Sequence, residues 1–429
     1  MSQPITKAKK LTEDVLPATY FLHKLQVGAA FTFAPMIATI KQLAATYAPE
    51  VIAIRRHLHQ HPELSYQEFE TSKFVQEKLK SWGIPFQVLA QTGVVGLVEG
   101  KNSASRVVAL RADMDALPIQ EENEVPYTSK VAGVMHACGH DVHTACLLGA
   151  AKILWETKAQ WEGTVKLIFQ PGEEKNPGGA SLLLKEGVLD NPKPQAIAAL
   201  HVNPQLETGL LSFRSGQVMA SADEIYITIK GTGGHAAAPH LTTDTILAAS
   251  QVVVALQGII SRNKNPLSSS VLSITSFQGG YTTNVIPTEV KLMGTFRAMD
   301  EDWRFKAHEL IKQTINGVCI AAGVGADVHI DVGYPVVYND PTLHEQAKTL
   351  AQQFMGEQAV HETEVRMGAE DFGFYAQHIP GCFFRLGTAN KERAITSGVH
   401  TPKFDIDERS IEIGVGMMAW LGTSLAVAR

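Results

Sequence analysis

A short segment, residues 133–144 (GVMHACGHDVHT), concentrates side chains that bind metals. Between positions 136 and 144 it carries three histidines, one cysteine and one aspartate, and a glycine separates Cys138 from His140. Such side chains are costly to bury without a partner. On extended or loop backbone, a cysteine and a histidine two residues apart can point to the same side, and both bind Zn, Mn, Co or Ni. A buried free cysteine beside surface histidines explains the segment equally well when it is taken alone.

Two adjacent carboxylates, Glu173 and Glu174, close the apolar segment TVKLIFQPGEE. One carboxylate can bind a metal ion while its neighbour takes a proton from water. A solvated acidic turn is the simpler interpretation of this pair by itself. His201 ends another apolar segment, and His400 lies in the polar stretch GVHTPKFD. Each of these histidines, taken singly, is more often structural, but four groups of ligand-type residues near strand ends favour a metal site.

The segments that must position these residues alternate between strand-like and helical patterns, which predicts a largely parallel α/β sheet. Ligands collect at the carboxyl ends of such strands, where RADMD, QPGEE and HVN lie. Ser65 and Glu68 predict a capping box for one helix, and Gly83 predicts its end. The predicted strands are 93–100, 106–115, 164–174 and 196–203, and the predicted helices are 41–61, 65–83 and 143–157.

The pattern changes near residue 219. A segment of alternating polar and apolar residues is followed by a long helical pattern, two more alternating segments, a helix and a last strand. This order predicts an inserted two-layer α+β sandwich. The predicted elements are strands 222–235, 269–280, 288–299 and 325–335 and helices 244–262 and 301–322. We therefore expect an N-terminal extension at 1–40, a catalytic domain at 41–218 and 334–429, and an inserted domain at 219–333.

The composition narrows the class of protein. The 429 residues carry a formal net charge of -6 and show no long basic run, which argues against a nucleic-acid partner. Four cysteines without a C-x-x-C pair exclude a zinc ribbon, and three of them (Cys146, Cys319 and Cys382) are expected to be reduced thiols. KAKK at 7–10 and the apolar residues 27–38 resemble a signal peptide, but charged residues interrupt them. We expect a cytoplasmic enzyme with no membrane span, with export as the alternative.

Several other site types are absent from the sequence. There is no H-E-x-x-H helix of the thermolysin kind and no G-x-S-x-G nucleophile elbow. His57 and His61 in HLHQHPE would share a helix face, and we expect them to be structural or to support ligands rather than bind a metal. GTGGH at 231–235 lacks the lysine and Ser/Thr of a phosphate-binding loop.

Taken in order, the motifs resemble those of a known family. RADMDALP, MHACGHDVHT, PGEE, LHV, GTGGHAAAPH, GGYTTNVIP, GTFRAMD and VHTPKF look like the aminoacylase/carboxypeptidase-G-type metallopeptidases, over about residues 41–425. Within them the chain is similar to the amidohydrolase branch of hippurate hydrolases, N-acyl-L-amino-acid amidohydrolases and auxin-conjugate amidohydrolases. The resemblance implies a parallel-sheet catalytic domain of zinc-peptidase type with an inserted lid and dimerisation domain.

The resemblance also implies roles for individual residues. Glu173 matches the family's general base, and Asp115 matches a carboxylate that orients a ligand. Classical members carry a histidine ligand two residues before that aspartate. Here Asp113 takes its place, which favours the amidohydrolase branch over classical peptidases. The positions that match ligands of the family's two divalent ions (Zn or Mn, with Ni or Co as further candidates) are Cys138, His140, Glu174, His201 and His400.

In the inserted domain, His235 matches a histidine that reaches the neighbouring subunit's active site and stabilises the oxyanion. Asn284 and Arg297 match positions that contact the substrate carboxylate, although an outward strand arginine is a competing interpretation of Arg297. The resemblance therefore implies a homodimer that cleaves small N-acyl amino acids. A dipeptidase, carboxypeptidase or N-acyl-diaminopimelate-type deacylase on the same site is the main alternative. A metal-binding protein without activity fits less well because Glu173 and all ligands are present, and no G-x-G-x-x-G supports a dinucleotide site.

Overall fold

The computed structural model describes residues 19–426. The chain begins there with the long helix α1, Thr19–Gln60, which includes Pro35 and Pro49. Part of the predicted N-terminal extension, residues 1–18 with the KAKK run, lies outside the described residues. The remainder, 19–40, is the first half of α1, so the predicted helix at 41–61 begins much earlier than its apolar periodicity indicates.

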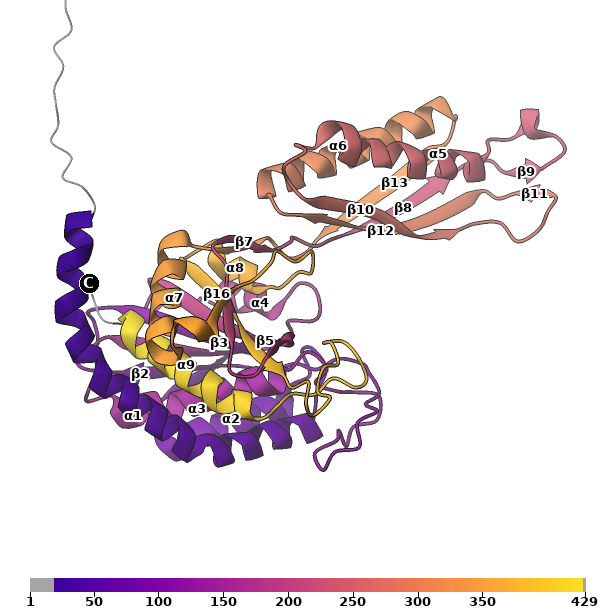
Figure 1. The fold of residues 1–429 in the computed structure, drawn as a ribbon. Helices are drawn as coiled ribbons and strands as arrows, with labels where there is room; N and C mark the ends of the chain where they lie inside the picture. Colours follow the sequence, from indigo (N-terminus) through magenta and orange to yellow (C-terminus); the bar gives the residue numbers. More distant parts are fainter. Residues whose placement is uncertain (1–18, 427–429) are drawn as a thin grey trace, which may run out of the picture.

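An eight-stranded sheet forms the centre of the catalytic domain, with the strand order β1-β2-β4-β3-β5-β16-β6-β15 (Figure 1). Its middle strands β4, β3, β5 and β16 are parallel, whereas β1 and β2 add antiparallel strands at one edge. At the other edge β6 is antiparallel to β16 and parallel to β15. The strands are β1 Phe86–Leu89, β2 Gly93–Glu99, β3 Val107–Asp113, β4 Thr164–Gln170, β5 Ala196–Glu207, β6 Leu211–Phe213, β15 Val360–Glu362 and β16 Gly381–Ala389.

Helices cover both faces of this sheet. On one face α1 packs with α2 (Phe69–Trp82), α3 (His140–Thr157), α7 (Pro341–Met355) and α9 (Arg409–Ala426) around the largest apolar core. The other face is covered by the short helices α4 (Gly179–Lys185) and α8 (Phe372–Ala376) with a smaller core. Because both faces are covered, strands β3 and β4 are buried along their whole length, as their apolar runs indicate.

The inserted lid is a four-stranded antiparallel sheet, β10-β12-β8-β13, with two helices on one face. It projects to one side of the catalytic domain, and the β9–β11 ribbon lies at its far end (Figure 1). The predicted order of strand, helix, strand, strand, helix, strand is confirmed, although the boundaries 219 and 333 stay predictions. The elements are β8 Asp223–Lys230, β9 Gly234–His235, η1 Pro239–Leu241, α5 Thr245–Gly258, η2 Ile259–Asn263, β10 Ser270–Gln278, β11 Val285–Ile286, β12 Glu289–Ala298, α6 Glu301–Ala321 and β13 Gly325–Val332.

The lid core forms because strand β8 alternates buried and exposed side chains, so that Ile225, Ile227 and Ile229 face α5 and α6. Among the described residues, one helical segment, Thr245–Asn263, is long and apolar enough to cross a membrane. Its side chains Val252 and Leu256 are buried in the lid core. The lid joins the catalytic domain beside β7 (Gly216–Met219) and β14 (Val337–Asn339), which pair with each other; the remaining element is η3 (Glu357–Ala359).

Several predicted boundaries were wrong for local reasons. The strand predicted to reach residue 174 ends at Gln170, because Pro171 lacks a donor and Gly172 has a φ of 48°. The strand predicted at 222–235 ends at Lys230 before a glycine-rich turn. The predicted capping box is also wrong: α2 begins at Phe69 and its N-cap residue Glu68 makes no capping hydrogen bond. The Glu63 carboxylate instead accepts from the N–H groups of Glu70 (3.2 Å) and Thr71 (2.8 Å) in the first turn. The predicted end of this helix at Gly83, with a φ of 79°, is confirmed.

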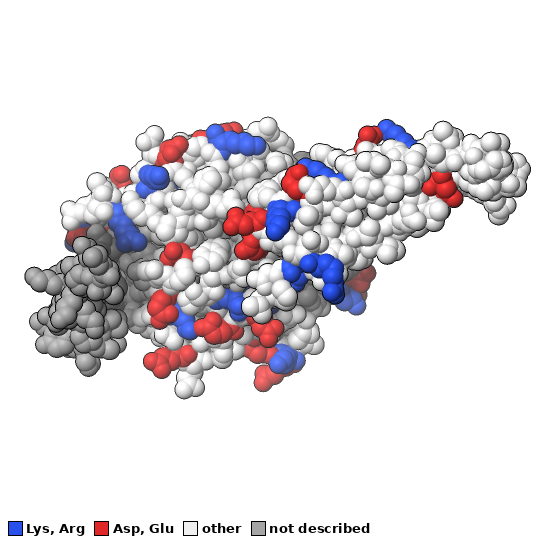
Figure 2. All heavy atoms as spheres, turned by 90° about the horizontal axis from the view of Figure 1, so that it is seen from above, with Lys and Arg blue, Asp and Glu red and all other residues white. Residues whose placement is uncertain are grey.

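Positive and negative side chains are interspersed over the lid and the catalytic domain on the face shown in Figure 2. This face carries no broad area of one sign. The arrangement suits the small net charge of the chain, -6.

Candidate active site

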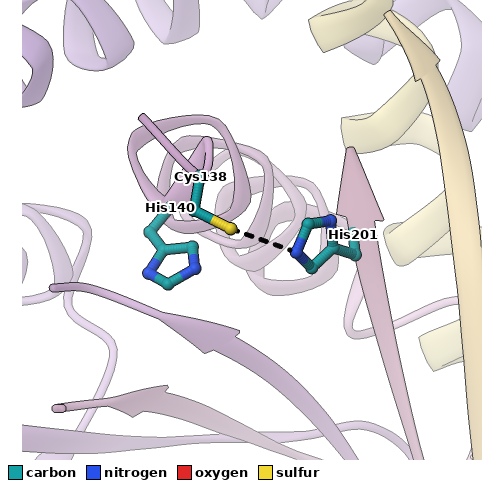
Figure 3. Close-up of side chains that lie close together, drawn as sticks. All are labelled: Cys138, His140 and His201. Atoms are coloured by element: carbon teal, nitrogen blue, oxygen red, sulfur yellow. Dashed lines mark hydrogen bonds between the residues drawn. The ribbon is translucent and has the colours of Figure 1, made fainter. Parts of the chain in front are cut away.

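The turn before α3 places Cys138 and His140 together. Gly139 between them has a φ of 84°, and a side chain there would approach Val202 Cγ2 to 2.6 Å. Only glycine meets both conditions without strain. Helix α3 then begins at His140, three residues earlier than predicted, so His140 is on a helix rather than on loop backbone. Figure 3 shows the Cys138 sulfur between the rings of His140 and His201.

Asp115 organises the site beyond the end of β3. Its Oδ1 accepts hydrogen bonds from His140 Nδ1 (3.1 Å) and from the backbone N–H of Glu173 (3.0 Å). Its Oδ2 accepts from Ser65 Oγ (2.6 Å) and from the N–H of Glu174 (3.0 Å). Burial alone would raise the pKa of Asp115, but the hydrogen bond from His140 lowers it. Ser65 therefore serves the site, which is why it does not cap α2.

The Glu68 carboxylate fixes the backbone on the opposite side of the PGEE turn. It accepts hydrogen bonds from the N–H groups of Tyr66 and Gly172, both at 2.8 Å, and from the Thr92 hydroxyl at 2.9 Å. Gly172 is needed there because a side chain would approach the Tyr66 ring to 2.3 Å. These contacts set the direction in which Glu173 and Glu174 leave the strand.

Among the described residues, five groups of ligand-type side chains could hold a metal ion, and two of these groups share Cys138. The first joins Cys138 to His140 and His201, and the second joins it to Glu174 and His400, with the ligand atoms of each group within 4.8 Å of one another. Cys138 Sγ is 3.5 Å from His201 Nε2, and His400 Nε2 is 3.1 Å from Glu174 Oε1. A thiolate shared by two such groups suits a pair of neighbouring ions.

The hydrogen-bond partners of His201 and His140 agree with these ligand assignments. His201 donates from Nδ1 to the carbonyl of Val202 (2.8 Å), and His140 donates from Nδ1 to Asp115, so both Nε2 lone pairs are free for a metal. His140 Nε2 is buried and has no hydrogen-bond partner among the described residues. This buried nitrogen faces a thiol and two carboxylates, and a bound cation would explain why it has no hydrogen-bond partner.

The other histidines of the motif are not available as ligands in the same way. His143 uses both nitrogens, since Nδ1 bonds Asp113 Oδ1 at 2.6 Å and Nε2 accepts from the Val202 N–H at 3.0 Å. His136 is buried away from the cleft, and burial lowers its pKa to about 4. His57 stacks on Phe74 at the surface, and the His61 ring lies tilted against His57, outside the cleft.

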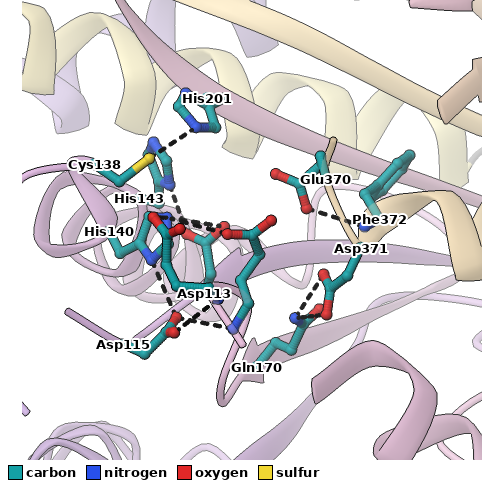
Figure 4. Close-up of polar contacts among 12 residues, drawn as sticks. Asp113, Asp115, Cys138, His140, His143, Gln170, His201, Glu370, Asp371 and Phe372 are labelled. Carbon is teal, nitrogen blue, oxygen red and sulfur yellow. Dashed lines mark hydrogen bonds and ion pairs between the residues drawn. The ribbon is translucent and has the colours of Figure 1, made fainter. Parts of the chain in front are cut away.

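Behind Glu173 lies an acidic cluster that the sequence reasoning missed. Buried Arg111 donates to Asp113 (2.6 Å), Glu370 (2.9 Å) and Asp371 (2.7 Å). Figure 4 shows these three carboxylates, with Gln170 bonded to Asp371 and the Phe372 backbone bonded to Glu370. Burial first, then Glu370 and Glu174, raise the pKa of Glu173 well above its usual value. The signal that could have found this cluster is GAEDF at 368–372, another pair of adjacent acids followed by an apolar segment.

A cleft of about 850 Å³ opens over these residues and reaches the lid. Its catalytic wall includes Cys138, Glu173 and His400, and its lid wall includes Arg297 of β12. The backbone carbonyl of Glu173 accepts a hydrogen bond from the hydroxyl of Tyr334, which lines the same cleft. Arg366 and Arg385, two further lining residues, were not singled out from the sequence.

The structure does not bring every predicted site residue to this cleft. His235 and Asn284 are exposed on the β9–β11 ribbon, where His235 pairs with Val285 at the far end of the lid (Figure 1). Neither lines the cleft of its own chain. Asp115, Cys138, His140, Glu173, Glu174, His201 and His400 are brought together, and Arg297 faces them across the cleft.

Comparison with known proteins identifies the family to which the chain belongs. Residues 109–421 match the family model described as Peptidase family M20/M25/M40, and the chain belongs to this family. It is 43% identical over 378 residues to IAA-amino acid hydrolase ILR1-like 4 of Arabidopsis thaliana, which covers 87% of this chain and 85% of the relative. It is 40% identical over 365 residues to N-acetylcysteine deacetylase of Bacillus subtilis, covering 85% of this chain and 93% of that protein.

Among solved structures, the chain is similar to the YXEP protein of Bacillus subtilis, described as a dinuclear metal binding peptidase of the M20 family. The TM-score is 0.76 at 34% identity, over 89% of this chain and 99% of that one. The predicted family and fold class are therefore confirmed. The protein is a hydrolase of amide bonds that uses two divalent metal ions.

Proposed function

We propose that the protein is a metal-dependent amidohydrolase that splits N-acyl-L-amino acids into a carboxylic acid and a free amino acid. The observation that carries this proposal is the placement of buried Glu173 beside two ligand groups that share Cys138, at the floor of a cleft with a guanidinium on the lid. Cys138, His140 and His201 would hold one ion, and Cys138, Glu174 and His400 the other. The names of the two curated relatives, an amino acid conjugate hydrolase and a deacetylase, support this substrate class.

The reaction needs a group that can take and return a proton. When bound, two divalent ions supply Lewis-acid catalysis to the amide carbonyl and make water easier to deprotonate. Glu173 takes the proton from the attacking water and delivers it to the amide nitrogen as the C–N bond breaks. A general acid–base works best with a pKa near the operating pH, and in the metal-free protein burial and the neighbouring Glu370 and Glu174 raise the pKa of Glu173. Asp115 holds the backbone of Glu173 and orients His140.

We further propose that Arg297 contacts the substrate carboxylate, because it lines the cleft and has only the Thr295 hydroxyl as a hydrogen-bond partner (3.2 Å) among the described residues. His235 and Asn284 would act on the cleft of a second subunit in a homodimer formed through the lid. Exposed apolar side chains of helix α5, Leu247 (56% exposed) and Val254 (73% exposed), support such an interface. A cytoplasmic location and the absence of nucleic-acid and membrane partners stay predictions.

Amino acid release from a panel of N-acetyl-, N-benzoyl- and indoleacetyl-amino acids tests the activity. The protein is assayed after chelation and after Mn²⁺ or Zn²⁺ is added back, with dipeptides as a separate arm. We expect metal-dependent release from the N-acyl amino acids and weaker release from dipeptides. Release from dipeptides alone would favour the peptidase alternative, and no release by folded, metal-loaded protein would refute the proposal.

The dimer proposal has an independent test. Glu173→Gln and His235→Ala chains, each inactive alone, are mixed under conditions that exchange subunits. In a mixed dimer, one cleft has an intact Glu173 and receives an intact His235 from the other subunit, so activity should return. No recovery in a mixture shown to contain mixed dimers would refute a role for His235 across the interface.

A further inference from the structure

Among the described residues, Arg385 is a buried arginine that has no carboxylate partner. Three others each pair with buried carboxylates: Arg55 with Asp141 at 2.7 Å, Arg111 with Asp113 at 2.6 Å, and Arg304 with Asp223 at 2.5 Å. Arg385 is only 3% exposed. Within residues 19–426 no carboxylate lies close enough to form an ion pair with it.

The contacts of Arg385 are weak for a guanidinium. Nη2 donates to the sulfur of Met219 at 2.9 Å, and the group lies over the Phe383 ring at 4.9 Å from its centroid. A thioether is a poor acceptor, and a guanidinium has five N–H donors. Burial first, and then Arg366, lower the pKa of Arg385 to about 10, which records how poorly its charge is compensated. A buried charge in this state is costly unless an anion completes it.

Arg366 lies next to this group and is partly exposed, and it also has no carboxylate partner among the described residues. Its Nη2 donates to two neutral amides, Asn203 Oδ1 at 3.2 Å and Gln205 Oε1 at 3.1 Å. Its backbone N–H bonds the carbonyl of Val218, which holds it beside Met219. Both guanidiniums line the cleft that also contains Cys138, His201 and Glu173.

The position of Arg385 in the sheet fixes the place of this pair. Arg385 on β16 is paired in register with His201 on the parallel strand β5. Arg297 belongs instead to β12 of the lid, on the other wall of the same cleft. Cationic side chains therefore line two walls of the cleft. A single substrate carboxylate can be held at only one of these walls.

We propose that Arg385 and Arg366 form a second carboxylate-binding subsite, so that the preferred substrates carry an acidic group in addition to the carboxylate held by Arg297. This inference rests on the proposed amidohydrolase function. The second carboxylate belongs either to a dicarboxylic acyl group or to the side chain of an acidic amino acid. Guanidinium groups bind carboxylates through paired, charge-assisted hydrogen bonds, which neutral amides cannot replace.

Matched pairs of substrates distinguish the two sources. The first pair is N-succinyl-L-leucine and its terminal carboxamide, and the second is N-acetyl-L-glutamate and N-acetyl-L-glutamine. We expect kcat/KM to favour the acid over its amide at least about tenfold in one pair. Arg385→Met and Arg366→Gln should bring that ratio towards one. Arg262→Gln, at an exposed lid arginine outside the cleft, should keep the wild-type ratio.

Ratios near one in both pairs for the wild type, or a ratio that Arg385→Met and Arg366→Gln leave unchanged, would overturn the proposal. Thermal unfolding checks that each variant is folded, and Arg366→Gln alone carries the test if Arg385→Met does not fold. If no N-acyl amino acid is hydrolysed, calorimetric binding of glutarate to metal-loaded protein replaces the ratio. Binding at least about tenfold weaker in the variants would support the subsite without the proposed function, and equal affinities would exclude it.

Discussion

Asp115→Asn tests how the site is held together. The carboxylate accepts four hydrogen bonds, two at each oxygen, whereas the amide offers one oxygen and an NH₂ group that must face donors. With NH₂ near His140, the ring would have to accept at Nδ1 and carry its proton on Nε2, which removes a metal ligand. We expect the opposite orientation, in which the Ser65 hydroxyl turns to accept and only the N–H of Glu174 loses its partner.

The expected loss of stability follows from the number of hydrogen bonds that the substitution removes. One hydrogen bond to a buried charged group is lost, which costs about 1.5–3 kcal/mol of unfolding free energy. His140 also loses the anionic partner that makes it a better ligand, so metal affinity should fall roughly 10–100-fold. Thermal or denaturant unfolding of the metal-free protein measures the first effect, and a Mn²⁺ or Zn²⁺ titration measures the second.

Ser65→Ala is the matched control, since it removes one donor but keeps the carboxylate. It should have a smaller effect on metal affinity than Asp115→Asn. Metal affinity indistinguishable from wild type in a folded Asp115→Asn protein would refute the reasoning that Asp115 orients His140. An equal loss in Ser65→Ala would show that packing around Asp115, rather than its charge, decides the affinity.

Three further predictions follow from the same structure. Glu173→Gln should lower kcat by about 10²–10⁴ while metal titrations stay near wild type; near-normal turnover would refute its role as general base. Chelation should lower the unfolding temperature and Mn²⁺ or Zn²⁺ should restore it, because bound metal stabilises only the folded state; an unchanged melting curve would count against the site. Bonds from His308 and Arg304 outweigh burial and lower the pKa of Asp223 below its usual 3.8. Its stabilisation is therefore complete above about pH 4 and lost at lower pH. Asp223→Asn should flatten that loss in acid denaturation, and an unchanged pH dependence would contradict the assignment.

The candidate metal ligands could be recognised from the sequence because their types are rare and their places are local. Cys138 and His140 lie two residues apart, and Glu174 and His201 lie at or just past predicted strand ends, where parallel strands deliver side chains to one edge. Residue type and strand order therefore pointed to a metal site at this edge, and the family resemblance implied its individual ligands. The boundary errors came from turns: glycines with positive φ and Pro171 ended strands that the apolar patterns would have continued.

The contacts that support the site, around Arg111 and at Ser65 and Glu68, could not be predicted from the sequence in this way. Arg111 and Glu370 are 259 positions apart, and neither neighbourhood indicates the other. Ser65 and Glu68 satisfy a local capping pattern, but tertiary contacts with Asp115 and Gly172 compete for the same oxygens and prevail. A buried carboxylate or hydroxyl bonds whichever donor the packing supplies, and that donor is decided by the fold.

The sequence by itself determined the family, the α/β class, the inserted lid and a set of candidate ligands, because these depend on periodicity, residue type and order along the chain. Only the tertiary structure decided that Arg385 is buried without a carboxylate, that Arg111 gathers three acids behind Glu173, and that His235 stands away from the cleft of its own chain. Burial and charge compensation are properties of neighbours in space, and those neighbours come from strands and loops far apart in the sequence.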